Sequence, residues 1–172
     1  MSTFSISSLY GGSISFISSF DPAIDWEKSE ISKKEYEADP IKFKTKIKFF
    51  EGKAPINIFL HHPTEEELMT AFQVGELDID PESGAVYRGQ TYAPGVGAVV
   101  GLSLAQQSLS TLCIDNVEGL DGWPTEAKAV NQFGLEELTK EAQEAFGPLQ
   151  IRKAVMKEIG RYLMEATAPK GE

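Results

Sequence analysis

The two histidines, His61 and His62, carry the most versatile chemistry in this 172-residue chain, because imidazole binds metals and exchanges protons near neutral pH. They are adjacent, and successive side chains of a strand point to opposite faces, so the pair cannot readily hold one metal ion. A zinc site needs three or four convergent ligands. The chain has a single cysteine, Cys113, and no H-E-x-x-H pattern. The sequence therefore predicts neither a metal site nor a cofactor.

Acidic side chains at Asp78, Asp80 and Glu82 match the start of a calcium-binding loop. The match ends at the sixth position, where Ser83 stands in place of the required glycine, and at the twelfth, where Gly89 replaces a bidentate glutamate. We interpret this segment as a solvated acidic turn, and weak cation binding stays an open alternative.

Catalytic motifs are equally weak in this sequence. The glycines between Gly95 and Gly101 follow Pro94 and lack the spacing of a phosphate-binding loop, so they fit a helix start better. The sequence shows no G-x-S-x-G elbow, no Walker lysine and no cysteine with an evident histidine partner. We therefore predict a non-enzymatic protein. A small enzyme with a carboxylate pair assembled by the fold is the less favoured alternative.

The clearest predicted element is a strand from Ile41 to Phe49. Its odd positions are apolar or β-branched, which predicts one buried face. Its even positions are lysines that must meet water or an anion: Lys42, Lys44, Lys46 and Lys48. These lysines either protect a sheet edge from pairing with other chains or dock an acidic protein partner.

Two further segments supply candidate partner contacts. A turn at 51–53 leads to a returning strand at 55–60, and Phe59 and His61 are the candidates there. Residues 1–20 have no charged side chain, and apolar residues alternate with serine as in a hairpin or an extended arm: Phe4, Ile6, Ile14 and Phe16. An uncharged, β-prone arm needs cover, either from its own domain or from another subunit of a homo-oligomer.

Helices are predicted for most of the remaining chain. The segment Thr64-Glu65-Glu66-Glu67 is a capping box that opens a helix, and a loop or short hairpin passes through 85–87. Small residues recur every four positions at Gly97, Gly101 and Ala105, which predicts a closely packed, buried helix. The predicted helices cover 65–74, 96–114, 125–146 with a pause at 133–134, and 149–166, the last with a stripe of Ile151, Val155, Ile159, Tyr162 and Leu163.

Together these elements predict an α+β fold, with N-terminal β-hairpins and a mainly helical C-terminal two thirds packed on them. We divide the chain into an uncharged N-terminal arm and polar linker over 1–40, an α+β domain over 41–166 and a frayed tail over 167–172.

The overall charge disfavours some classes of partner. With 16 basic and 26 acidic residues the net charge is -10, so nucleic acid and anionic membranes should repel the chain. No apolar run approaches the roughly 18 residues of a membrane span, and the N-terminus has no basic segment of a signal peptide. Cys113 stands in an apolar run, which favours a buried thiol and a reducing compartment.

The order of several elements resembles that of small tailed-bacteriophage tail assembly chaperones. The first part is a hairpin with its turn at Gly52, a strand ending at His61-His62-Pro63, and the helix opened by Thr64. The later part, with Cys113-Ile114, the segment up to Trp123, Leu135 to Leu138 and the Ile151–Leu163 helix, is similar in layout. Residues 1–40 and 75–100 depart from the pattern.

This resemblance implies a non-enzymatic, chaperone-like protein that acts in the bacterial host cytoplasm. It would shield apolar surfaces of a tail component, such as the tape-measure protein, during assembly. The departing segments would equally suit a permanent virion subunit in the tail, the head–tail adaptor or the capsid.

Overall fold

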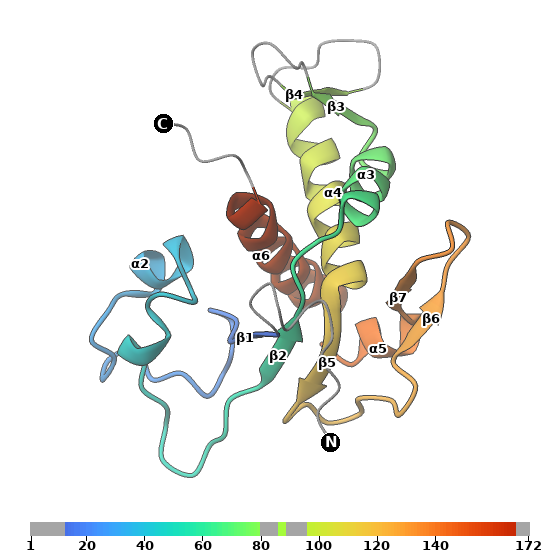
Figure 1. The fold of residues 1–172 in the computed structure, drawn as a ribbon. Helices are drawn as coiled ribbons and strands as arrows, with labels where there is room; N and C mark the ends of the chain where they lie inside the picture. The colour runs from blue at the N-terminus through green and yellow to red at the C-terminus, as the bar shows by residue number, and fades with distance from the viewer. Residues whose placement is uncertain (1–12, 80–85, 89–95, 168–172) are drawn as a thin grey trace.

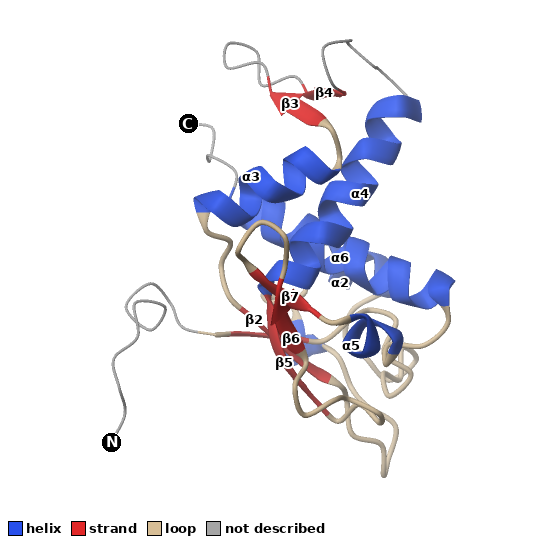
Figure 2. Ribbon diagram, turned by 90° about the vertical axis from the view of Figure 1, so that its right-hand side faces the viewer, coloured by secondary structure: helices blue, strands red, loops and turns tan. Residues whose placement is uncertain are grey.

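A computed structural model describes residues 13–79, 86–88 and 96–167 of the chain (Figures 1 and 2). It contains helices together with antiparallel strands, which confirms the predicted α+β class. The strands are β1 (Ile14–Phe16), β2 (Asn57–Leu60), β3 (Leu77–Ile79), β4 (Val86–Arg88), β5 (Ile114–Glu118), β6 (Lys128–Val130) and β7 (Glu136–Leu138). The helices are α2 (Lys33–Ala38), the 3₁₀ turn η1 (Lys44–Lys46), α3 (Glu65–Val74), α4 (Val96–Cys113), α5 (Lys140–Glu144) and α6 (Leu149–Thr167).

The central sheet has three antiparallel strands in the order β1-β2-β5. Phe16 pairs with Ile58, and Ile58 pairs with Val117, so one face of the sheet is apolar across all three strands. That face packs with α4 and α6 around the main core, and Leu109, Leu112, Ile159 and Leu163 on these helices are fully buried. Burial of such side chains is the main stabilising contribution of a core.

Glycine allows α4 and α6 to cross at very short range. A Cβ atom built on Gly160 of α6 would lie 2.1 Å from the backbone oxygen of Gln106 on α4, so only glycine fits there. Further along α4, a Cβ on Gly101 would lie 2.7 Å from the backbone oxygen of Gly75, and Ala105 is fully buried. The predicted helix with closely packed small residues is therefore confirmed at Gly101 and Ala105.

The capping box and the helix over 65–74 are confirmed as well. The Thr64 hydroxyl accepts a hydrogen bond from the Glu67 amide at 3.1 Å, and the Glu67 carboxylate accepts one from the Thr64 amide at 2.9 Å. The last predicted helix is α6, although Ile151 of its predicted buried stripe is half exposed, because it lies one turn before the first core residue, Val155. The short hairpin is present as β3 paired with β4. Asp80 and Glu82 of the acidic segment lie outside the described residues.

A second apolar cluster lies beside the main core, around α2 and η1 on the left of Figure 1. Tyr36 is its largest member, fully buried, and its hydroxyl donates to the Ile17 backbone oxygen at 2.6 Å. The cluster consists of Ile17, Ile24, Ile31, Tyr36 and Ile47. It takes residues from both sides of position 40, where the predicted domain boundary lies; that division into 1–40, 41–166 and 167–172 stays a prediction.

The predicted strand over Ile41–Phe49 is wrong. This segment forms turns and η1, and its one bridge within the described residues joins Phe49 to Ile24. Two physical reasons account for the difference. The side chain of Asp39 accepts a hydrogen bond from the Lys42 amide, which starts a turn, and both edges of β2 are already paired, with β1 and with β5.

The predicted helix over 125–132, and its continuation through 138, are also wrong. These residues form the β6–β7 hairpin instead, with Val130 paired to Glu136. Gly134 adopts a left-handed φ of 77°, and the Asn131 side chain accepts hydrogen bonds from the amides of Phe133 and Leu135. Asparagine favours such a turn because its side chain can bond to the backbone a few residues on, and glycine favours it because it adopts a positive φ without steric cost. Only α5 remains helical, after Thr139.

Among the described residues, no helix combines the length and the apolar character needed to cross a bilayer.

Candidate functional site

A cluster of ionisable side chains lies where β2, α3, α4 and β5 meet. His61 follows the end of β2, Glu67 belongs to the capping box of α3, and Cys113 is the last residue of α4. Asp115 is the extra residue of a β-bulge, because Phe59 pairs with Asn116 while the next residue of β2 pairs with Ile114. A bulge redirects a side chain relative to its strand, and this one directs Asp115 toward His61.

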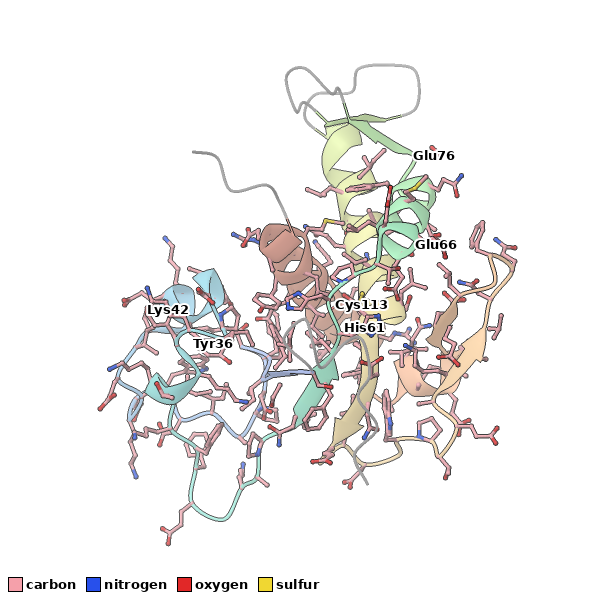
Figure 3. All side chains as sticks on the ribbon, in the orientation of Figure 1. Tyr36, Lys42, His61, Glu66, Glu76 and Cys113 are labelled. Carbon is pink, nitrogen blue, oxygen red and sulfur yellow. The ribbon has the colours of Figure 1, made fainter. Side chains whose placement is uncertain are left out.

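Both ring nitrogens of His61 face carboxylates. Nδ1 lies 2.7 Å from Oδ1 of Asp115, and Nε2 lies 3.0 and 2.9 Å from the two oxygens of Glu67. The thiol of Cys113 lies in the same cluster, since one ligand atom from each of His61, Glu67 and Cys113 lies within 4.8 Å of the others. Figure 3 shows the labelled side chains of His61 and Cys113 beside each other at the centre of the molecule.

Hydrogen bonds to Asp115, to Cys113 and to Glu67 raise the pKa of His61 to about 12, against the opposing effect of burial. Both ring nitrogens are therefore protonated and donate to the carboxylates. Burial by itself would raise the pKa of Glu67, but hydrogen bonds from His61 and Thr64 outweigh it and lower that pKa. Burial raises the pKa of the Cys113 thiol.

This cluster does not have the geometry of a nucleophilic site. A cysteine–histidine pair attacks a substrate only if the sulfur can reach it, and Cys113 is fully buried. The groups could instead hold a cation, because imidazole, carboxylate and thiolate are all metal ligands. His62, in contrast, is exposed, so the two histidines do point to different environments, as the sequence indicates.

A groove lies on another part of the surface, between α3, α4 and the β6–β7 hairpin. It consists of two adjoining hollows, of about 520 and 360 Å³, that share Thr70 and Phe133 in their lining. Four large apolar side chains line it although they are exposed: Met69 by 63%, Phe133 by 47%, Val74 by 43% and Leu104 by 41%. We call this surface the hairpin groove. A contiguous group of exposed apolar side chains commonly marks an interaction site.

The polar lining of the hairpin groove is mostly uncharged. Gln107, Gln143 and Asn131 contribute amides, whereas Glu66 and Glu137 are the charged residues of the lining in the part of the chain that the structure describes. Glu66 is labelled in Figure 3 on the outer side of α3. Neither lysine nor arginine belongs to this described lining, so the formal charge of the lining is negative.

The four lysines predicted as one face of a strand do not share a face. Lys44 is half buried and its ammonium donates to the backbone oxygen and the hydroxyl of Ser15, at 3.3 and 2.8 Å. Lys46 lies 3.8 Å from a Glu30 carboxylate oxygen, and the Lys42 ammonium lies over the Phe43 ring. Lys42, Lys46 and Lys48 are exposed, and Lys42 lies on the opposite side of the molecule from Glu66 in Figure 3. Docking of an acidic partner on these lysines stays a prediction.

The apolar candidates differ in their surroundings. Phe16 is fully buried in the main core, 5.7 Å from the Tyr162 ring, and Ile14 packs against the same core. Ile14 and Phe16 are therefore covered by their own domain, which was one of the two alternatives for the arm. Phe16 is not available to a partner. Phe59 is half buried on the other face of the central sheet. Phe4 and Ile6 lie outside the described residues.

The sequence marks His61 as a candidate contact but does not reveal its partners in the fold. The capping box did identify the position of Glu67, whereas Asp115 and Cys113 carry no local signal that connects them to His61. The hairpin groove was missed because the residues on both sides of Phe133 are predicted to be helical, with only a pause at 133–134.

No protein-family model, no curated protein and no solved structure matches this chain.

Proposed function

We propose that this protein is a non-enzymatic bacteriophage tail assembly protein that holds an apolar segment of a tail component in the hairpin groove. The observation that supports this best is the set of exposed apolar side chains around the groove, with Met69 exposed by 63% and Phe133 by 47%. A monomeric protein gains nothing by exposing such side chains together, whereas an assembly chaperone uses them to cover apolar surface of its client.

The charge of the groove narrows the chemistry of the occupant. Glu66 and Glu137 are its charged lining residues among those described, and the chain carries a net charge of -10. A complementary segment is therefore apolar, with lysine or arginine beside the apolar residues. We propose the tape-measure protein as the client, bound in the bacterial host cytoplasm and released as the tail assembles. The exposed lysines Lys42, Lys46 and Lys48 would form a separate contact for an acidic neighbour.

A second hypothesis is that the protein remains in the virion as a tail, adaptor or capsid-associated subunit. The uncharged N-terminal arm favours this alternative, since it could dock on another subunit or on a second copy. In that case the protein is present in purified particles. A chaperone is present during assembly and absent from the finished particle.

Co-expression with a tape-measure fragment tests the proposed function. We expect the wild-type protein to keep the fragment soluble and to co-purify with it. Phe133→Glu should reduce the recovered fragment at least about tenfold, because a buried carboxylate opposes both the apolar contact and the negative groove. Phe50→Glu is the matched control, since Phe50 is a phenylalanine of nearly equal exposure, 44%, on the segment after η1.

Equal losses in the two phenylalanine variants would argue against the hairpin groove. Absence of any association between wild-type protein and fragment would argue against the chaperone function itself. Lys46→Glu, assayed in parallel, tests the lysine contact: a loss with this variant alone would assign the client to the lysines.

A further inference from the structure

We propose that His61, Glu67 and Cys113 form a binding site for a divalent transition-metal ion, with Zn²⁺ as the expected occupant. This inference does not depend on the proposed function, because none of the three ligand residues belongs to the lining of the hairpin groove. It departs from the sequence prediction of no metal site. That prediction considered the two histidines together, whereas the structure brings a cysteine and a glutamate to one of them.

The ligand chemistry favours zinc over magnesium or calcium. One imidazole nitrogen, one thiol sulfur and one carboxylate oxygen lie within 4.8 Å of one another. Tetrahedral zinc with its usual bond lengths places such ligand atoms about 3.3 to 3.8 Å apart. The separations here lie on both sides of that range, from 2.9 Å between Nε2 and a Glu67 oxygen to at most 4.8 Å within the group. Magnesium and calcium prefer oxygen ligands alone, and a thiolate selects against them.

Asp115 provides the orientation that a metal-binding histidine needs. Its Oδ1 lies 2.7 Å from Nδ1 of His61, which leaves Nε2 directed at Glu67, and the Cys113 sulfur belongs to the same group of ligand atoms. Histidine ligands of metals commonly donate their second N–H to a carboxylate in this way. The β-bulge that directs Asp115 therefore has a use beyond the pairing of β2 with β5.

The exchange of protons for a metal ion preserves the charge of this buried site. Before binding, the His61 imidazolium, the Lys128 ammonium 3.6 Å from Asp115 and the carboxylates of Glu67 and Asp115 sum to a charge of about zero, with the thiol neutral. Zinc displaces the Nε2 proton and the thiol proton, and both protons leave to solvent. The new sum of one Zn²⁺, the Lys128 ammonium, two carboxylates and one thiolate is again about zero, so binding adds no uncompensated charge to the interior.

Access and coordination number are also compatible with a metal ion. The side chain of Glu67 is 8% exposed and that of His61 is 23% exposed, so the site opens to solvent on the histidine side. Three protein ligands leave a fourth position for a water molecule on that side.

Titration of the purified, metal-free full-length protein with Co²⁺ tests the site. Thiolate ligation of Co²⁺ gives an intense near-ultraviolet charge-transfer absorption, and Zn²⁺ should abolish it by displacement. Cys113→Ser should lose this absorption, and His61→Gln should weaken binding at least about tenfold, whereas His62→Gln serves as the matched control and should bind like the wild type. Asp115→Asn, which changes a positioning residue, should weaken binding about 10- to 100-fold while the absorption remains at saturation.

Two results would overturn the metal site. One is a wild-type protein without charge-transfer absorption at saturating Co²⁺, a measurement that needs no variant to fold. The other is equal weakening by His61→Gln and His62→Gln, with circular dichroism showing both variants folded, because only His61 faces Glu67 and Cys113.

Discussion

Glu158 connects α6 to the segment that follows β1. Its carboxylate is bonded by the Ser18 hydroxyl at 2.6 Å, by the Ser19 amide at 3.1 Å and by the Ser19 hydroxyl. The Ser19 hydroxyl also lies 3.1 Å from a carboxylate oxygen of Glu37, and its single proton cannot serve both acids. A protonated Glu158 resolves the conflict by donating to Ser19. Burial favours the same protonated state, because it raises the pKa of Glu158 although the serine hydrogen bonds oppose that rise.

The raised pKa of Glu158 predicts a pH dependence of stability. The folded state binds the proton of Glu158 more tightly than the unfolded chain does. This proton therefore stabilises the fold fully below a pH of about 4.5, and its contribution to the unfolding free energy is lost as the pH rises through the pKa of the folded state. Glu158→Gln carries no such proton, and its unfolding free energy should fall less than that of the wild type between pH 4.5 and 7.

Urea denaturation at several pH values measures this difference. Glu165→Gln, on the exposed face of the same helix, is the control and should follow the wild-type profile. If Glu158→Gln and the wild type lose stability in parallel over that range, the carboxyl of Glu158 is ionised in the fold and this account of Ser19 is wrong.

At the scale of elements, the crossing of α4 and α6 depends on close backbone contact. Gly160 lies against Gln106, and the Ser110 hydroxyl of α4 donates to the Met156 backbone oxygen of α6. Both contacts require the two helix axes to approach more closely than larger side chains would allow. The crossing holds the helices on the apolar face of the central sheet.

Substitution of Gly160 by alanine should therefore destabilise the protein. Alanine normally improves a helix by about 1 kcal/mol over glycine, but the added Cβ would meet backbone atoms of Gln106. We expect a net loss of about 1 to 3 kcal/mol, the usual cost of overpacking, measured by chemical denaturation. Lys153→Ala, at an exposed position of α6, should change stability by less than about 0.5 kcal/mol. An unchanged or raised stability of Gly160→Ala would show that the helices separate without cost.

At the scale of the whole molecule, the chain builds two apolar clusters of unequal size. The main core joins the central sheet to α4 and α6, whereas the second cluster encloses Tyr36 with four isoleucines. β1 and the bonds of Ser18 and Ser19 to Glu158 connect the two. Because free energies of local opening follow the buried contacts of each region, the second cluster should open more readily than the main core.

Tyr36→Ala should loosen the second cluster selectively. Removal of a large buried aromatic side chain costs about 3 to 5 kcal/mol, and the loss falls on a region with few other buried contacts. We expect amide hydrogen exchange to accelerate strongly over residues 17–50 and to change little in α4 and α6. Tyr36→Phe, which loses only the hydrogen bond to the Ile17 backbone oxygen, should show a smaller change in the same region. Equal acceleration throughout the protein would mean that the two clusters unfold as one unit.

Local sequence determined the elements whose signals lie within one helix. The capping box at Thr64 and Glu67 needs residues three positions apart, and the small residues Gly101 and Ala105 need one helical face, so both were predictable. Patterns whose outcome depends on distant partners were misleading. The alternation from Ile41 to Phe49 is typical of a strand, but both edges of β2 are occupied and its lysines turn to different partners.

The candidate metal site and the hairpin groove were decided by tertiary structure. Asp115 lies 54 positions from His61 in sequence, and Cys113 is almost as far, so no periodicity connects them. They meet because β5 pairs with β2 and α4 ends at that pairing, which in turn follows from burial of the apolar sheet face. The residue types in the sequence determined which chemistry was possible, and the cooperative packing of distant segments decided which of those residues came together.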